Sequence, residues 1–140
     1  MADVSVLLDR FVQLFNTDRF DEALQDYAPE GVVEEVGTGR RLTPQEGIGN
    51  ARAWRQAFPD AQGTITSKLI DGRNGAAEIV WRGTNRGPLM GQPPTGKAVT
   101  VRAVVVLETN GSVITRSSHY IDVAGLMGQL GAASGMRAAG

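Results

Sequence analysis

The spacing of the hydrophobic residues changes partway along this 140-residue chain, and that change constrains the fold more than any other feature. Before Asp60 the apolar side chains recur at helical spacing, which predicts three helices, over residues 4–15, 20–27 and 44–57. After Asp60 come four segments rich in Val, Ile, Thr and Trp, which predict strands over residues 64–70, 76–82, 98–107 and 113–123. Helices followed by consecutive strands predict an α+β fold, with the three N-terminal helices packed in a curved, mostly antiparallel sheet.

Turn and capping residues mark where these elements begin and end. Thr43, Pro44 and Glu46 have the pattern of a capping box with proline at the first helical position. Asp71-Gly72 and Asn110-Gly111 are typical of hairpin turns. Residues 83–97 (GTNRGPLMGQPPTGK) are interpreted as an ordered rim loop. A curved sheet wrapped around helices leaves an apolar cavity open at one end, which suits a small-molecule site.

The amino-acid composition excludes several classes of binding partner and of catalytic site. The net charge is −1 and the charges are interspersed, so neither nucleic acid nor an anionic membrane surface is expected as a partner. With no cysteine and one histidine, disulfides, thiolate catalysis and a metal site are not expected. No apolar run approaches the roughly 20 residues that span a bilayer, and the N-terminus does not resemble a signal peptide, so we expect a cytoplasmic protein. We expect one domain over residues 1–131 and a flexible tail over residues 132–140.

The single histidine and an unusual acid lie on the last predicted strand. Because side chains alternate along a strand, Ser118, Tyr120 and Asp122 share one face, and His119 lies on the other. If the first face is turned toward the helices, Asp122 lies in the cavity as a general acid/base with a raised pKa. Alternatively, Asp122 caps a following helix. An Asp122–His119 dyad is disfavoured, and His119 is expected on the outer face or at a subunit contact.

Other candidates belong to the expected walls of the cavity. Glu34 and Glu35 follow one another on a short predicted strand, residues 32–36, so at most one of them enters the cavity. The alternative is that both are solvated. The aromatic residues Phe15, Tyr27, Trp54 and Trp81 are interpreted as core or cavity wall and not as catalytic groups.

Three blocks of sequence together resemble one known family. They are residues 53–60 (AWRQAFPD), the loop 83–97, and residues 120–131 (YIDVAGLMGQLG), and their order and spacing cover nearly the whole chain. In this respect the chain is similar to the SnoaL-like polyketide cyclases, a family of ester cyclases. The resemblance implies the cone-shaped α+β barrel shared with nuclear transport factor 2, ketosteroid isomerase and limonene epoxide hydrolase. It also implies a homodimer formed through the sheet.

In the cyclases of this family, a cavity Asp near the end of the last strand is the acid/base of an aldol ring closure. Asp122 occupies that position, so the resemblance implies a cofactor-independent cyclase of aromatic or polyketide substrates in antibiotic biosynthesis, with no metal. The residues expected to contact substrate are Tyr120, Ser118, Trp81, Trp54, Glu35, Phe15 and Met90, with His119 as a secondary candidate. The family often has an aromatic residue where this chain has Ser118, and His or Asn near Glu35.

Two alternatives to the cyclase remain open at this point. Some members of the family are cofactor-independent hydroxylases of aromatic polyketides, in which an electron-rich substrate reacts with oxygen directly. The other alternative is a non-catalytic module that binds a small molecule. Both rest on the same scaffold, and a fold alone does not choose a reaction.

Overall fold

The computed structural model of the protein describes residues 3–131, so the tail predicted over residues 132–140 lies outside the described residues. The elements in chain order are α1 (Val4–Asn16), α2 (Phe20–Gln25), β1 (Tyr27–Glu35), β2 (Arg40–Leu42), α3 (Pro44–Ala57), β3 (Gln62–Asp71), β4 (Asn74–Thr84), β5 (Ala98–Thr109), β6 (Ile114–Ile121) and α4 (Val123–Leu130). Among the described helices, none has the length and apolar character needed to cross a membrane.

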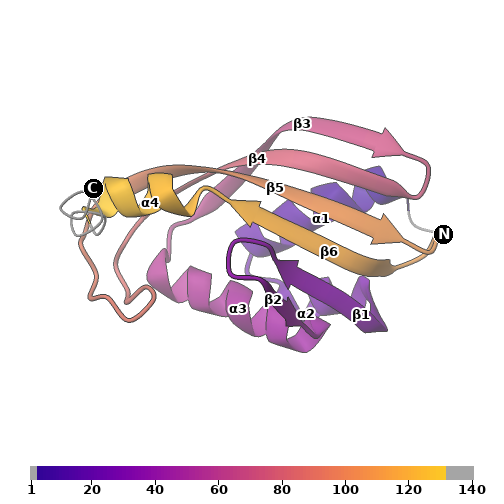
Figure 1. Ribbon diagram of the computed structural model, residues 1–140, viewed down its shortest axis with the longest axis horizontal. Coiled ribbons are helices and arrows are strands. Elements are labelled where there is room, and N and C mark those ends of the chain that lie inside the picture. The colour runs from indigo at the N-terminus through magenta and orange to yellow at the C-terminus, as the bar shows by residue number, and fades with distance from the viewer. Residues whose placement is uncertain (1–2, 132–140) are drawn as a thin grey trace.

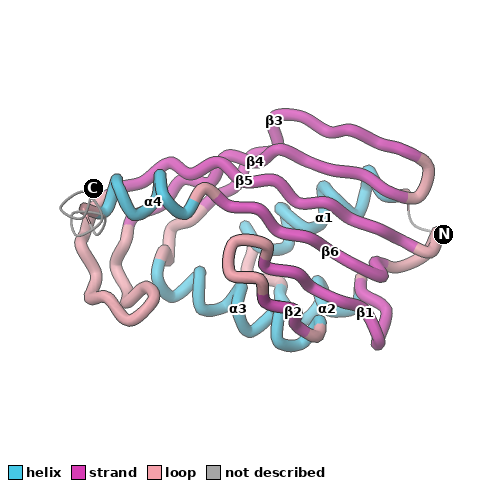
Figure 2. Tube along the Cα trace, in the orientation of Figure 1, coloured by secondary structure: helices cyan, strands magenta, loops and turns pink. Residues whose placement is uncertain are grey.

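The six strands form one curved sheet in the order β2-β1-β6-β5-β4-β3. β1 and β6 run parallel, and the other neighbouring strands pair antiparallel. The helices α1, α2 and α3 lie on the concave side of the sheet, while α4 continues from the end of β6 (Figures 1 and 2). The predicted α+β architecture with a curved, mostly antiparallel sheet is confirmed.

Two hydrophobic clusters hold the helices against the sheet. In the first, Leu8 of α1 packs against Leu107 of β5, and both side chains are completely buried. In the second, Phe58 at the end of α3 packs with Val101 of β5 and Leu126 of α4. Burying one such side chain stabilises the fold by about 1.5–3 kcal/mol. Partly buried aromatic residues pack against both clusters, and they form the walls of the cavity described below.

The start of α3 and the two hairpins follow the sequence signals. The Thr43 hydroxyl accepts a hydrogen bond from the Glu46 N–H at 3.1 Å, and the Glu46 carboxylate accepts one from the Thr43 N–H at 2.9 Å. This capping box, with Pro44 in the first turn, confirms the predicted start of the helix. Gly72 and Gly111 have φ angles of 60° and 91° in the turns that join β3 to β4 and β5 to β6. Glycine adopts these angles at little cost.

Three local features differ from the prediction. The second helix was expected to include Tyr27, but α2 ends at Gln25 and Tyr27 begins β1, where it pairs with Ile114 of β6. The strand β2 was not predicted, because three residues are too few to show an alternating pattern. The last strand was expected to run to Val123, but β6 ends at Ile121 and Val123 begins the helix α4, which Gly131 caps in a left-handed conformation.

Candidate functional site

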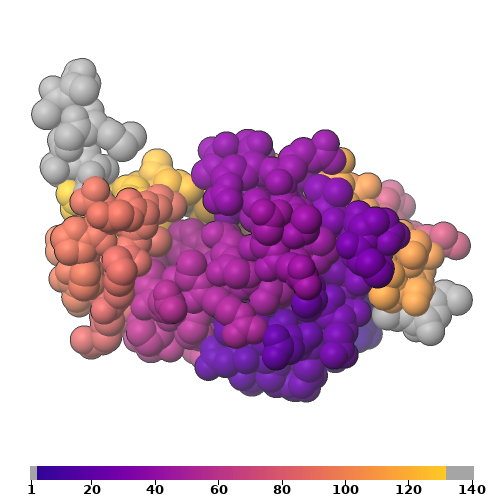
Figure 3. All heavy atoms as spheres, turned by 90° about the horizontal axis from the view of Figure 1, so that it is seen from below, coloured from indigo at the N-terminus to yellow at the C-terminus, as the bar shows by residue number. Residues whose placement is uncertain are grey.

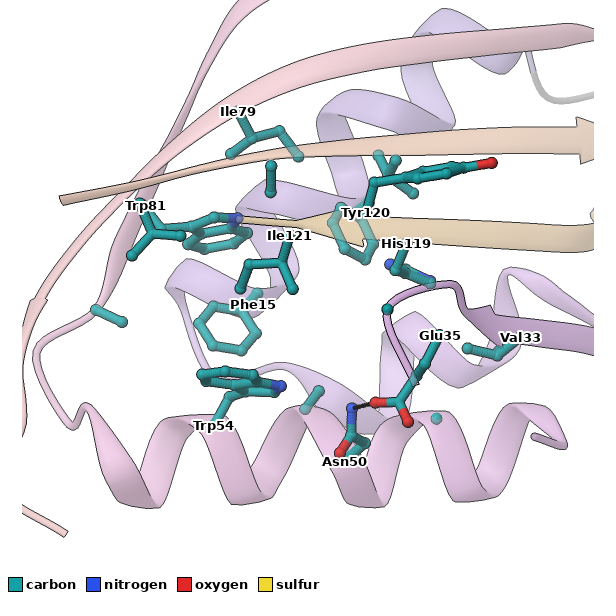
Figure 4. Close-up of a pocket in the computed structure, with 18 of the residues that line it drawn as sticks. Phe15, Val33, Glu35, Asn50, Trp54, Ile79, Trp81, His119, Tyr120 and Ile121 are labelled. Carbon is teal, nitrogen blue, oxygen red and sulfur yellow. Dashed lines mark hydrogen bonds between the residues drawn. The ribbon is translucent and has the colours of Figure 1, made fainter. Parts of the chain in front are cut away.

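A cavity of about 240 Å³ lies between the concave face of the sheet and the helices α1, α2 and α3. Its walls are mostly apolar and include several aromatic rings (Figure 4). The rings of Phe15 and Trp81 meet edge to face with centroids 4.8 Å apart, and those of Trp54 and Phe58 stack at 6.1 Å. The volume is close to the lower end of the roughly 300–1,000 Å³ typical of small-molecule sites. Aromatic walls of this kind favour a flat, apolar ligand.

Glu35, at the end of β1, is the one carboxylate among the described residues that line the cavity. Its side chain is 18% exposed. Asn50 of α3 donates a hydrogen bond from Nδ2 to Oε2 of Glu35 (Figure 4). The other carboxylate oxygen, Oε1, lies 3.3 Å from Nη1 of Arg40 and accepts a hydrogen bond from the Thr38 hydroxyl at 3.4 Å. These donors fix the carboxylate at the cavity wall.

His119 faces the same cavity from β6 and is the register partner of Glu35 in the parallel β1–β6 pair. Its Nε2 lies 2.8 Å from Oγ of Ser117, and the Tyr27 hydroxyl donates to the same Oγ at 2.8 Å. The ring of Phe11 packs beside the imidazole at 5.4 Å. Burial lowers the pKa of His119 to about 4 and raises the pKa of Tyr27 to about 12. Both side chains are therefore neutral at pH 7.

Asp122 does not line the cavity, so its expected placement on the cavity face is wrong. It is exposed, and its Oδ1 accepts a hydrogen bond from the Gly125 N–H at 2.9 Å, which caps α4. This is the alternative considered for Asp122 above. Ser118 is buried on the same outer face and is also absent from the cavity lining. Tyr120 is 46% exposed and borders both the cavity and a hollow on the outer face that it shares with Asp122.

The neighbouring strand β5 determines which face of β6 turns inward. His119 and Ser117 lie opposite Val105 and Leu107, and both of these β5 side chains are buried in the core. The face that carries His119 must therefore also face the core, since paired residues share a face of the sheet. The part of β5 that pairs with this end of β6, residues 103–107, is apolar on both faces, so it did not show which face is the inner one. The exposed Thr100 and Arg102, earlier on β5, mark its outer face and were the usable signal.

The other expected wall residues lie where the strand and helix patterns put them. The cavity is lined by Phe15, Trp54, Trp81 and Met90. Glu35 enters it, whereas Glu34 points to the opposite face and accepts a hydrogen bond from Arg116 at 2.6 Å. Within residues 3–131, no three His, Asp or Glu side chains are grouped as they would be around a metal ion.

A family profile matches residues 5–130, and the family is that of the SnoaL-like polyketide cyclases. The chain belongs to this family. The match runs from α1 to α4, so it includes both strands that carry Glu35 and His119. The family predicted from the three sequence blocks is thus confirmed. No protein of curated function matches the chain in sequence.

Solved structures share the fold of this SnoaL-like chain. AclR from Streptomyces galilaeus, described as a candidate hydroxylase, is 21% identical with a TM-score of 0.82 over 91% of this chain and 80% of its own. IdmH from Streptomyces antibioticus, described as a candidate polyketide cyclase, is 23% identical with a TM-score of 0.81 over 91% and 97%. A protein from Catenulispora acidiphila with a ketosteroid isomerase-like fold is 17% identical with a TM-score of 0.76 over 89% and 92%.

The rim loop of the SnoaL-like chain, residues 83–97, is built on the buried side chain of Asn85. Its Nδ2 donates to the Gly87 carbonyl at 2.9 Å and to the last carbonyl of α3 at 3.3 Å, while its Oδ1 accepts from the Thr95 N–H at 2.8 Å. Met90, at the tip of the loop with a φ of 50°, reaches the cavity lining. Seen from the helix side, the loop stands beside the end of α3 (Figure 3).

Two polar residues of the site, Asn50 and Ser117, were not predicted from the sequence. Tyr27 was expected in the core or the cavity wall and does line the cavity, but its contact with Ser117 was not predicted. Asn50 lies one helical turn before Trp54 on α3, so the spacing of the helix contains a usable signal. Tyr27 and Ser117 are 90 positions apart and meet because β1 pairs with β6. A parallel pairing between distant strands has no local signature in the sequence.

Proposed function

We propose that this protein is a polyketide cyclase that closes a ring by an intramolecular aldol addition, with Glu35 and His119 as its acid/base pair. One observation carries the proposal. Glu35 and His119 project side by side from two adjacent strands into a cavity whose other walls are largely apolar and aromatic. A few polar groups converging in an apolar pocket are the usual mark of an active site.

An aldol closure needs two proton transfers that these groups can serve. A base removes a proton from a carbon next to a carbonyl, and the resulting enolate carbon bonds to a second carbonyl carbon of the same molecule. The alkoxide formed there takes up a proton, so the product is an isomer of the substrate. A carboxylate is a weak base, so the carbon that loses its proton is expected to lie between two carbonyl groups, which spread the enolate charge. A β-keto ester side chain on an aromatic polyketide has this structure.

The aromatic walls supply the other half of the proposed catalysis. Phe15, Trp54 and Trp81 surround the centre of the cavity from α1, α3 and β4 (Figure 4). Stacking a flat ring system between them would fold the flexible side chain of the substrate back toward Glu35 and His119. Holding two reacting carbons in contact in this way supplies several kcal/mol of the barrier reduction.

The experiment separates this pair from Asp122, the residue expected from the family resemblance. The variants E35Q, H119Q and D122N are assayed for product formation on a panel of aromatic polyketides that carry an open β-keto ester side chain. E34Q is the matched control, because Glu34 lies on the opposite face of the same strand. Asn caps helices about as strongly as Asp does, so D122N should retain the fold.

We expect E35Q and H119Q to lose about 10²–10⁴-fold in kcat/KM, the usual effect of removing a general acid or base, while D122N and E34Q stay near the parent. Loss of turnover in D122N with an active H119Q would return the acid/base role to Asp122. Oxygen uptake matched to product would assign a hydroxylase instead. Saturable binding of every panel member without conversion would assign a binding module.

A further inference from the structure

A chain of three hydrogen-bonding side chains runs from the core to the cavity. The Tyr27 hydroxyl of β1 donates to Oγ of Ser117 at 2.8 Å, and the same Oγ lies 2.8 Å from Nε2 of His119. Ser117 is completely buried. Within residues 3–131, the Ser117 hydroxyl contacts no other hydrogen-bonding partner, and the same holds for the Tyr27 hydroxyl. Among the described residues, these two contacts are the ones available to the polar hydrogens of the chain.

Counting those hydrogens identifies the protonated nitrogen of His119. Two contacts can accommodate two hydrogens, and the hydroxyls of Tyr27 and Ser117 already supply two. Tyr27 then donates to Ser117, and Ser117 donates to Nε2, which must be bare. A hydrogen on Nε2 would be the third, and it would leave one of the two hydroxyls without an acceptor among the described residues. Such an unpaired donor disfavours a state by about tenfold or more.

We propose that Tyr27 and Ser117 are positioning residues that hold His119 as a neutral imidazole protonated at Nδ1, so that His119 offers the substrate a hydrogen-bond donor and not a base. Nδ1 makes no hydrogen bond to the described part of the chain, and one ring nitrogen is directed toward the interior of the cavity in Figure 4. The inference rests on the proposed function, in which His119 and Glu35 share the proton transfers. It divides their roles: Glu35 removes the proton from carbon, and the Nδ1–H group hydrogen-bonds the oxygen that becomes negatively charged.

The surroundings of His119 support a ring that stays neutral. The titratable side chains that line the cavity besides His119 are Tyr27, Glu35, Arg82 and Tyr120. Of these, Glu35 is the acid, and it is already bound by Asn50 and Arg40. The imidazolium form would carry hydrogens on both nitrogens and meet the same conflict at Ser117. A neutral imidazole donor is an established way to polarise a carbonyl without placing a charge in an apolar site.

The test is direct because the chain has one histidine. Protein labelled with ¹⁵N in histidine is examined by long-range ¹H–¹⁵N correlation at pH 7. Nε2 couples strongly to both ring hydrogens and Nδ1 strongly to one, so the two nitrogens are distinguished, and bare and protonated nitrogens resonate far apart. We expect a bare Nε2 and a protonated Nδ1. A protonated Nε2, or an imidazolium at pH 7, would overturn the inference.

Three variants separate positioning from general structural damage. S117A removes the hydrogen-bond donor to Nε2 of His119. We expect the preference for the Nδ1-protonated tautomer to fall by about tenfold or more, so that the Nε2-protonated tautomer becomes populated. S118A is the matched control, a buried serine on the opposite face of the same strand, and should keep the parent spectrum. Y27F should weaken the preference for the Nδ1-protonated tautomer less than S117A does, because Tyr27 acts on His119 only by polarising the hydroxyl of Ser117. An unchanged spectrum in S117A would refute the positioning role.

The spectrum does not depend on the reaction, so the two proposals fail separately. If E35Q and H119Q keep full turnover while the spectrum shows protonated Nδ1, the proposed function is wrong and the tautomer assignment stands. If both variants lose turnover while the spectrum shows protonated Nε2, the acid/base pair stands and the division of roles is wrong.

Discussion

Lowering the pH from 7 to 5 should destabilise this protein through one side chain. Burial holds the pKa of His119 at about 4 in the folded state, against about 6.5 in the unfolded chain. Between these values the unfolded state binds a proton that the folded state does not bind. Stability therefore falls as the pH drops from about 6.5 toward about 4, and below that range the loss is complete.

The size of the effect follows from the two pKa values. One pKa unit corresponds to about 1.4 kcal/mol, and at pH 5 the unfolded histidine is almost fully protonated while the folded one is almost fully neutral. The difference in the free energy of unfolding between pH 7 and pH 5 comes to about 2 kcal/mol. With a urea dependence of about 1–3 kcal/mol per molar, this moves the unfolding midpoint by roughly 1 M.

The assay is urea unfolding at pH 7, 6 and 5, followed by tryptophan fluorescence. H119Q is the control, since glutamine does not titrate and all histidine titration in the chain belongs to His119. The carboxyls whose pKa is lowered by hydrogen bonds, Glu22, Glu46 and Asp60, lose stabilising interactions mainly below pH 5 and do so equally in both proteins. A parent protein with the same midpoint at pH 7 and 5, or an H119Q variant that loses as much as the parent, would refute the reasoning.

Three further predictions concern the loop, the cavity wall and the sheet. N85A should lower the free energy of unfolding in urea by about 2–4 kcal/mol and should make the loop 83–97 sensitive to limited proteolysis, because it leaves the carbonyls of two buried residues, Ala57 and Gly87, without the donor that Asn85 supplies. G63A should lower the free energy of unfolding by about 1–3 kcal/mol and change the tryptophan fluorescence, since a Cβ at Gly63 would lie 2.6 Å from the ring of Trp81. If the protein dimerises through the outer face of its sheet, light scattering should report a dimer that Y120K converts to monomer, because Tyr120 is exposed there.

The order of the elements could be predicted from the sequence because its signals are local. The capping box at Thr43, the hairpin glycines and the switch in hydrophobic spacing each depend on neighbouring residues, and each was confirmed. The end of α2 could not be predicted in the same way. Tyr27 leaves the helix because its hydroxyl and backbone find partners in β6, far along the chain, and this tertiary pairing overrides the helical pattern.

The site was harder to predict than the fold because it depends on one binary choice. Alternation separated Asp122 from His119 correctly, yet the sequence did not say which of the two faces the helices. β6 is polar on both faces, and the residues of β5 paired with its inner end, 103–107, are apolar on both, so this pairing leaves the choice open. Thr100 and Arg102 at the start of β5 were the signal for its outer face. The polar outer residues Ser118 and Asp122 were therefore assigned to the cavity, and His119, which lies in it, was ranked second.

The unequal surroundings of Glu35 and His119 fit the two groups to different halves of the proposed reaction. Glu35 lies beside Arg40, whose side chain is 60% exposed, and Asn50 donates to its other oxygen, so a negative charge is solvated there. His119 is enclosed by Phe11 and by the hydroxyl of Ser117, and a positive charge there has no such solvation. In the proposed reaction, Glu35 is therefore the charged group that accepts a proton, and His119 is the neutral group that donates a hydrogen bond. The difference follows from where each side chain lies. The parallel pairing of β1 with β6 brings the two together, and either strand without the other would carry only half of the site.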